Sequence, residues 1–147
     1  MNNLLTIGAY GHSHQSFFDR LDSCRVDLFV DIRQRRGMRG SAYAFPGPPP
    51  VGRQFPRRVI DHPQLNGLAP ASAIRDAQRE ADRTLGATKR SREGLSELFE
   101  AKYMAEVVAT ANLESILGRL ARYERVCFFC VEREARACHR SLVASWI

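Results

Sequence analysis

The chain has 147 residues, a length that suits one domain with a real hydrophobic core. Its formal net charge of +6 is compatible with an anionic partner, such as a phosphorylated small molecule or nucleic acid, but does not choose between them. No stretch approaches the roughly eighteen apolar residues of a membrane span, and Met1 to Leu5 lack the basic start of a signal peptide, so we expect a cytoplasmic protein without membrane contact.

Two apolar runs near the start of the chain predict strands. Leu4–Ile7 is followed by a glycine-containing turn and then by Ser13, which is placed to cap an amphipathic helix. Val26–Ile32 is a second apolar run, with an acid, Asp31, near its end. Strands that alternate with helices favour a parallel sheet.

The segment from about residue 33 to residue 66 is rich in arginine, glycine and proline, and we predict an irregular loop there. Arg33 and Arg39 lie close to glycines in this segment. Such a combination can bind phosphate, although the arginines of a solvated coil have the same appearance in a sequence.

The middle of the chain predicts helices. Ala71–Leu85 has Ser72 as its expected cap and a weak apolar stripe. Further apolar residues at helical spacing run from Leu95 to Ala111 and from Leu113 to Leu120. We interpret these stripes as core-facing.

The last strand is expected from Val126 to Val131, and it leads directly into a polar segment. Glu132 follows the strand, and Cys138, His139 and Arg140 precede a short helix-like pattern at the end of the chain. Ligands of open α/β sheets bind beyond the carboxyl ends of the strands. The sequence therefore predicts a site where this segment meets Ser13 and Asp31.

Several motifs resemble a bacterial and archaeal family called domain of unknown function 488. They are Thr6-Ile7-Gly8 with Ser13 and Phe17, Val30-Asp31-Ile32-Arg33, and Cys130-Val131-Glu132 with Cys138-His139-Arg140-Ser141-Leu142. Three further motifs resemble one branch of that family, namely Gly37-Met38-Arg39-Gly40, Tyr43-Ala44-Phe45 and Leu68-Ala69-Pro70.

The resemblance implies a small α/β domain with a largely parallel central sheet and no established reaction. The implied pocket would collect Ser13, Asp31, Arg33, Glu132, Cys138, His139 and Arg140. Relatives show a helix and a further strand between Pro46 and Asn66, but Pro48–Pro50 forbid that helix start here. We therefore expect a single three-layer α/β/α domain over residues 1–147, Rossmann-like, with an incomplete sheet edge.

The first functional hypothesis is an enzyme that acts on a nucleotide, a nucleic acid or another phosphorylated ligand by acid–base chemistry. The groups expected to move or orient protons are Glu132, His139 and Asp31. The arginines expected to hold phosphate are Arg33, Arg39 and Arg140. The remaining wall of the pocket is assigned to Ser13 and Cys138.

The alternative is a module that binds an anion or nucleic acid without catalysis, in which Glu132 and Arg140 form a structural ion pair. Breaking such a buried pair costs about 3 to 5 kcal/mol, so its loss would damage folding. Phosphate affinity is expected under both hypotheses and does not separate them.

Thiol and metal chemistry are weighed against these hypotheses. Cys130 and Arg136 have the spacing of the phosphate loop of cysteine phosphatases, but the residues between them include two acids and no glycine. Cys127 and Cys130 are spaced as in a zinc knuckle, with Cys138 and His139 nearby. Residues three apart on a strand face opposite ways, and adjacent Cys138 and His139 would not easily share an ion. We therefore expect neither a metal nor a cofactor.

Overall fold

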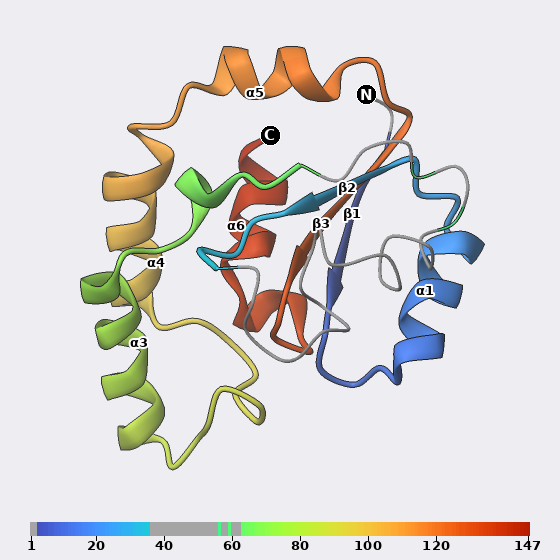
Figure 1. Cartoon of the computed structure of the whole chain (residues 1–147). Coiled ribbons are helices and arrows are strands. Elements are labelled where there is room, and N and C mark those ends of the chain that lie inside the picture. Colours follow the sequence, from blue (N-terminus) through green and yellow to red (C-terminus); the bar gives the residue numbers. More distant parts are fainter. Residues whose placement is uncertain (1–2, 36–55, 57–58, 60–62) are drawn as a thin grey trace.

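Three parallel strands form the central sheet of this computed structural model, which describes residues 3–35, 56, 59 and 63–147 (Figure 1). They are β1 (Asn3–Gly8), β2 (Leu28–Asp31) and β3 (Arg125–Cys130), in the spatial order β1-β3-β2. Every residue from Val126 to Cys130 is buried, as expected for an apolar strand between two neighbours. The prediction of a small α/β fold with a parallel sheet is confirmed.

The register of the strands brings their carboxyl ends to one edge of the sheet. Gly8 lies opposite Cys130, and Asp31 lies opposite Phe129. The loops that follow all three strands therefore start at neighbouring positions. This shared edge is where the candidate site is built.

Helices cover both faces of the sheet. On one face, α1 (His14–Ser23) packs the ring of Phe17 against Phe129, with 5.4 Å between the ring centroids. Side chains alternate along a strand, so Cys130 points to the opposite face, where it meets the start of α6 (His139–Trp146). Figure 1 shows α1 on one side of the sheet and α6 and α4 on the other.

The middle of the chain forms helices in the regions that the apolar spacing predicted. These are α3 (Ser72–Thr84), α4 (Glu97–Tyr103), a π-helical turn (Met104–Val108) and α5 (Leu113–Leu120). The expected cap at Ser72 is wrong, because Ala71 occupies the N-cap position and no side-chain hydrogen bond caps α3. Short 3-10 turns occupy Asn66–Leu68 and Ala135–Ala137.

Most of the predicted arginine-, glycine- and proline-rich loop lies outside the described residues. Where the description resumes, Gln64 forms an isolated parallel bridge to Asp31. The amide of Asp31 donates to Pro63 O at 3.0 Å, and the amide of Leu65 donates to Asp31 O at 2.9 Å. Within the described part of the chain, the bridge to Gln64 covers the outer edge of β2. Among the described helices, none combines the length and apolar character needed to cross a membrane.

Candidate functional site

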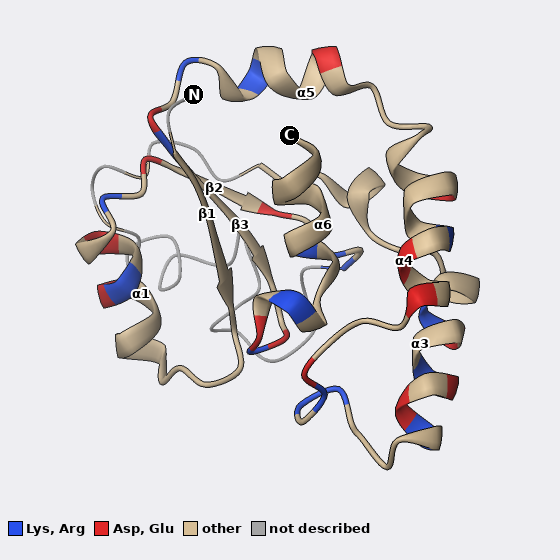
Figure 2. Ribbon diagram, turned by 180° about the vertical axis from the view of Figure 1, so that it is seen from behind, with Lys and Arg blue, Asp and Glu red and all other residues tan. Residues whose placement is uncertain are grey.

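A cavity of about 820 Å³ lies beyond the carboxyl ends of β2 and β3, and its wall also includes α3 and the loop after α3. Its volume is in the range of small-molecule sites. Two carboxylates, those of Asp82 and Glu132, belong to the lining. The cationic residues of the lining are Arg33, Arg35, Arg75, Arg79, Arg83, Lys89 and Arg92. Figure 2 shows blue, basic segments in α3 and in the loop that follows it.

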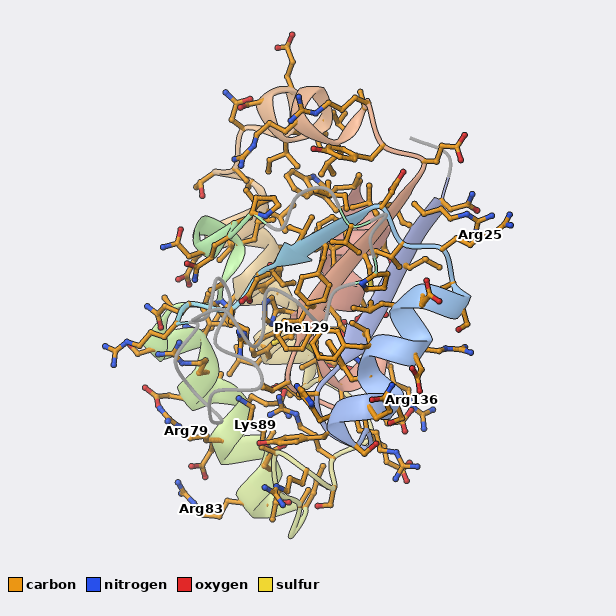
Figure 3. All side chains as sticks on the ribbon, turned by 45° about the vertical axis from the view of Figure 1, so that its right-hand side comes forward. Arg25, Arg79, Arg83, Lys89, Phe129 and Arg136 are labelled. Carbon is orange, nitrogen blue, oxygen red and sulfur yellow. The ribbon has the colours of Figure 1, made fainter. Side chains whose placement is uncertain are left out.

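Three of these arginines share one face of α3. Arg75, Arg79 and Arg83 follow one another at four-residue intervals, and Figure 3 shows Arg79 and Arg83 on the same side of the molecule as Lys89. Arg79 and Arg83 each pair with an exposed acid three residues earlier, and exposed pairs of this kind contribute little. Arg75 donates to neutral oxygens, Gln34 Oε1 at 2.6 Å and Pro70 O at 3.0 Å.

Glu132 supplies a buried carboxylate to this cavity. Its Oε1 lies 3.0 Å from Nη2 of Arg92 and 3.4 Å from Nζ of Lys89, and the residue is 4% exposed. Burial by itself raises the pKa of Glu132, but the positive charge of Lys89, a hydrogen bond from Cys138 and the charge of His139 lower that pKa to about 2. The carboxylate is therefore ionised at neutral pH.

Two thiols and an imidazole lie next to Glu132. Cys130 donates to Glu132 Oε2 at 3.3 Å, and Cys138 Sγ lies 3.7 Å from His139 Nδ1. Burial raises the pKa of Cys138, but hydrogen bonds from Cys130 and His139 lower it to about 6. The hydrogen bond to Cys138 and burial both raise the pKa of Cys130. Of the two thiols, Cys138 therefore has the lower pKa.

His139 is held between the cluster and the end of β2. Its Nε2 lies 3.3 Å from the carbonyl oxygen of Ile32. Burial lowers the pKa of this imidazole, but the neighbouring Cys138 and the Glu132 carboxylate raise it above its ordinary value. His139 and Cys130 line the cavity, whereas Cys138 lies behind them and is 1% exposed.

Arg140 stabilises the backbone of the turn after β3. Its Nη1 donates to Glu132 O at 2.7 Å and its Nη2 donates to Arg133 O at 2.9 Å, and the residue is 2% exposed. A Cβ on Gly8 would lie 1.8 Å from Glu132 O, so only glycine lets β1 approach this turn. Arg140 is not among the cavity-lining residues. The carboxylate of Glu132 pairs with Arg92 instead, so the ion pair between Glu132 and Arg140 in the alternative hypothesis is wrong.

Asp31 and Arg33 form a buried pair at the end of β2. Arg33 donates from Nε to Asp31 Oδ1 at 2.9 Å and from Nη2 to Asp31 Oδ2 at 2.7 Å. Its guanidinium carbon also lies 4.5 Å from the centroid of the Phe129 ring. Asp31 therefore orients Arg33, which lines the cavity, while Asp31 itself does not.

Two further predicted residues are separate from this arrangement. Ser13 is the N-cap of α1, is exposed, and accepts a hydrogen bond from the amide of Ser16 at 3.1 Å. It is not among the cavity-lining residues. Arg39 lies outside the described residues.

The sequence analysis missed the polar face that α3 turns toward the site. Gln78 and Asp82 are buried, and Gln78 Nε2 donates to Asp82 Oδ1 at 2.8 Å. Arg92 links this face to Glu132, because its Nη1 lies 3.1 Å from Asp82 Oδ2. The sequence contains an indication of this buried polar face, because Gln78 and Asp82 follow Ile74 at four-residue intervals and so share its helix face, which is buried.

Comparison with protein-family models matches residues 26–147 to the family described as DUF488-N3a, active DUF488-N3 subclade. The matched segment contains the cavity-lining residues, whereas β1 and Ser13 precede it. Comparisons with curated proteins and with solved structures gave no match.

Proposed function

The chain belongs to the DUF488-N3a family, and from this premise and its cavity we propose that it binds a phosphorylated small molecule of nucleotide size and acts on it by acid–base chemistry. The observation that carries the proposal is one cavity with seven cationic residues in its lining and a buried carboxylate beside a buried imidazole. The description of the subclade as active agrees with a reaction at this site.

The arrangement of charge on α3 supports phosphate as the bound group. Arginines four residues apart on a helix repel one another by a few tenths of a kcal/mol per pair, and an anion between Arg75, Arg79 and Arg83 removes that repulsion. A guanidinium also binds phosphate oxygens through two parallel hydrogen bonds. Arg75 is the main phosphate-binding residue in this proposal, because its described hydrogen bonds go to neutral oxygens.

The shape of the site favours a small ligand over a nucleic acid strand. A cavity of about 820 Å³ accommodates a mononucleotide, whereas a strand needs an extended basic groove. The site also fits a reducing cytoplasm, where the four cysteines, which form no disulfide, remain thiols.

We assign the chemical step to the two ionisable groups in the wall of the cavity. Glu132 stays ionised and orients a substrate hydroxyl or a water molecule, and His139 exchanges the proton. Asp31 acts through Arg33 and is a positioning residue. Cys138 sets the charge state of His139 from behind the cavity wall.

Binding is tested by calorimetric titration with AMP, with adenosine as the matched ligand that lacks phosphate. We expect AMP to bind and adenosine to bind at least tenfold more weakly. A hydrogen bond to a charged group contributes about 1.5 to 3 kcal/mol, so Arg75→Gln should raise the Kd of AMP about tenfold or more. Arg119→Gln removes the same charge from exposed α5 and serves as the control. Equal effects of both substitutions would contradict a phosphate site at Arg75.

Catalysis is tested separately by incubating wild-type protein with a panel of nucleotides and separating the products by chromatography. We expect turnover that His139→Gln and Glu132→Gln abolish while AMP binding persists. Binding without any turnover across the panel would leave the non-catalytic binding module as the better hypothesis.

A further inference from the structure

Three potential metal ligands converge at the end of β3, although they come from two elements. Cys130 is the last residue of β3, Cys138 is the N-cap of α6, and His139 is the first residue of α6. One ligand atom from each residue lies within 4.8 Å of the other two, and all three residues are buried.

The spacing of these atoms approaches that of a tetrahedral zinc site. Zinc binds thiolate sulfur at about 2.3 Å and imidazole nitrogen at about 2.0 to 2.1 Å, which places neighbouring ligand atoms about 3.5 to 3.8 Å apart. Cys138 Sγ and His139 Nδ1 are already 3.7 Å apart. Small shifts of Cys130 relative to the other two residues would complete the geometry.

The backbone at the start of α6 explains how adjacent residues can share one ion. Cys138 is extended, with φ −143° and ψ 142°, while His139 begins the helix. This change of direction brings the Cys138 sulfur and the His139 ring to one side. At this junction adjacent Cys138 and His139 can therefore face the same ion, contrary to the expectation from their sequence positions.

The other nitrogen of His139 has the partner that a metal-bound histidine requires. Its Nε2 faces the carbonyl oxygen of Ile32 at 3.3 Å, and a ring N–H that donates to a carbonyl leaves Nδ1 with its lone pair toward the thiols. Metal-binding histidines in proteins are oriented by such a second hydrogen bond.

A fourth ligand position of such an ion would lie on the cavity side of the cluster. Cys130 and His139 line the cavity, and Glu132 Oε2 is 3.3 Å from Cys130 Sγ. Two sulfurs, one nitrogen and a fourth position open to water form the ligand pattern of catalytic rather than structural zinc. Two thiolates and an imidazole also select zinc over magnesium or calcium, which prefer oxygen ligands.

We propose that Cys130, Cys138 and His139 bind a zinc ion, with the fourth coordination position directed into the cavity beside Glu132. The proposal stands apart from phosphate binding, because it depends on sulfur and imidazole ligands and not on the arginines of α3. In the metal-loaded protein the Nδ1 lone pair of His139 would be bound to the ion, and the ionised Glu132 would lie beside it.

The test starts from wild-type protein purified in buffer containing zinc and analysed for metal by mass spectrometry. We expect one zinc per chain after removal of loosely bound metal. After chelation, titration with Co²⁺ should give the visible bands of tetrahedral cobalt together with a thiolate-to-cobalt charge-transfer band. Wild-type protein that folds but takes up neither ion overturns the proposal without recourse to any variant.

Variants then assign the ligands. Cys138→Ser and Cys130→Ser should each weaken zinc binding at least a hundredfold and remove or shift the charge-transfer band, with folding checked by circular dichroism. Cys127→Ser is the matched control, because Cys127 is a buried thiol of the same strand outside the cluster. Zinc binding that survives both cluster substitutions, or that Cys127→Ser weakens as much, overturns the assignment. AMP titrations in parallel distinguish this failure from failure of the phosphate site.

Discussion

Replacing Glu132 with glutamine should remove a pH-dependent contribution to stability. This contribution is large because the environment of the Glu132 carboxylate favours its ionised form. The pKa of this carboxyl falls from its ordinary value of 4.5 to about 2, because the charges of Lys89 and His139 and a hydrogen bond outweigh the effect of burial. One pKa unit corresponds to about 1.4 kcal/mol. The ionised carboxylate therefore contributes about 3 kcal/mol to the free energy of unfolding at neutral pH.

The direction of the pH dependence follows from the lowered pKa. The contribution is fully present above the unfolded pKa, near pH 4.5, and is lost as the pH falls through about 2, because the unfolded chain takes up the proton first. Glutamine cannot ionise, so the free energy of unfolding of the variant lacks this part of the pH dependence. Any difference in stability that remains when Glu132 is protonated comes from the exchange of a neutral acid for an amide and does not depend on Glu132 titration.

The assay is urea unfolding of wild-type protein and Glu132→Gln between pH 2 and pH 7, followed by circular dichroism. We expect the stability difference between the two proteins to shrink by about 3 kcal/mol as the pH falls from about 6 to 2. Glu114→Gln, at an exposed carboxylate in the first turn of α5, is the control and should show a much smaller change. Parallel curves for wild type and Glu132→Gln across this range would refute the electrostatic reasoning.

Other substitutions test the scaffold of the site by urea unfolding and AMP titration. Gly8→Ala places a Cβ 1.8 Å from Glu132 O and should destabilise the protein by more than about 2 kcal/mol. Gly118→Ala, where nothing lies within 4 Å of the added Cβ in a helix, should instead stabilise it by about 0.5 to 1 kcal/mol, and the same sign for both would contradict the close approach at Gly8. Arg140→Lys removes the guanidinium that donates to two backbone carbonyl oxygens, so it should lower the free energy of unfolding by about 2 to 3 kcal/mol while the folded protein keeps its AMP affinity. A stable variant that fails to bind AMP would place Arg140 at the ligand. Ser13→Ala should cost about 1 kcal/mol through the lost cap and leave AMP affinity within about twofold, and a larger loss of affinity would show that Ser13 reaches the ligand.

The cluster around Glu132 shows why the identity of a site residue is easier to predict than its partner. Glu132 follows a strand, and that position could be inferred from the apolar run before it. Its carboxylate pairs with Arg92, forty residues earlier in the chain. Such a pairing depends on how α3 and the following loop pack against the sheet. No periodicity in the sequence encodes that packing.

The same limit explains the polar face of α3. Gln78 and Asp82 look solvent-exposed in a helix whose strongest apolar residue is Ile74. In the folded chain they are buried, because Gln78 also accepts a hydrogen bond from the amide of Ser96 at 2.8 Å and Arg92 reaches Asp82. Burial of a polar residue becomes visible only when its distant partners are in place.

The sequence by itself determined the strands, most of the helices, the cap at Ser13 and the parallel α/β class, because these features depend on residues close together in the chain. Tertiary structure alone decided that β3 lies between β1 and β2. It also decided that Arg140 supports the backbone while Arg92 faces Glu132, and that two thiols and an imidazole from separate elements meet. Contacts of that kind follow from the packing of the whole chain, in which each pairing is fixed by all the others.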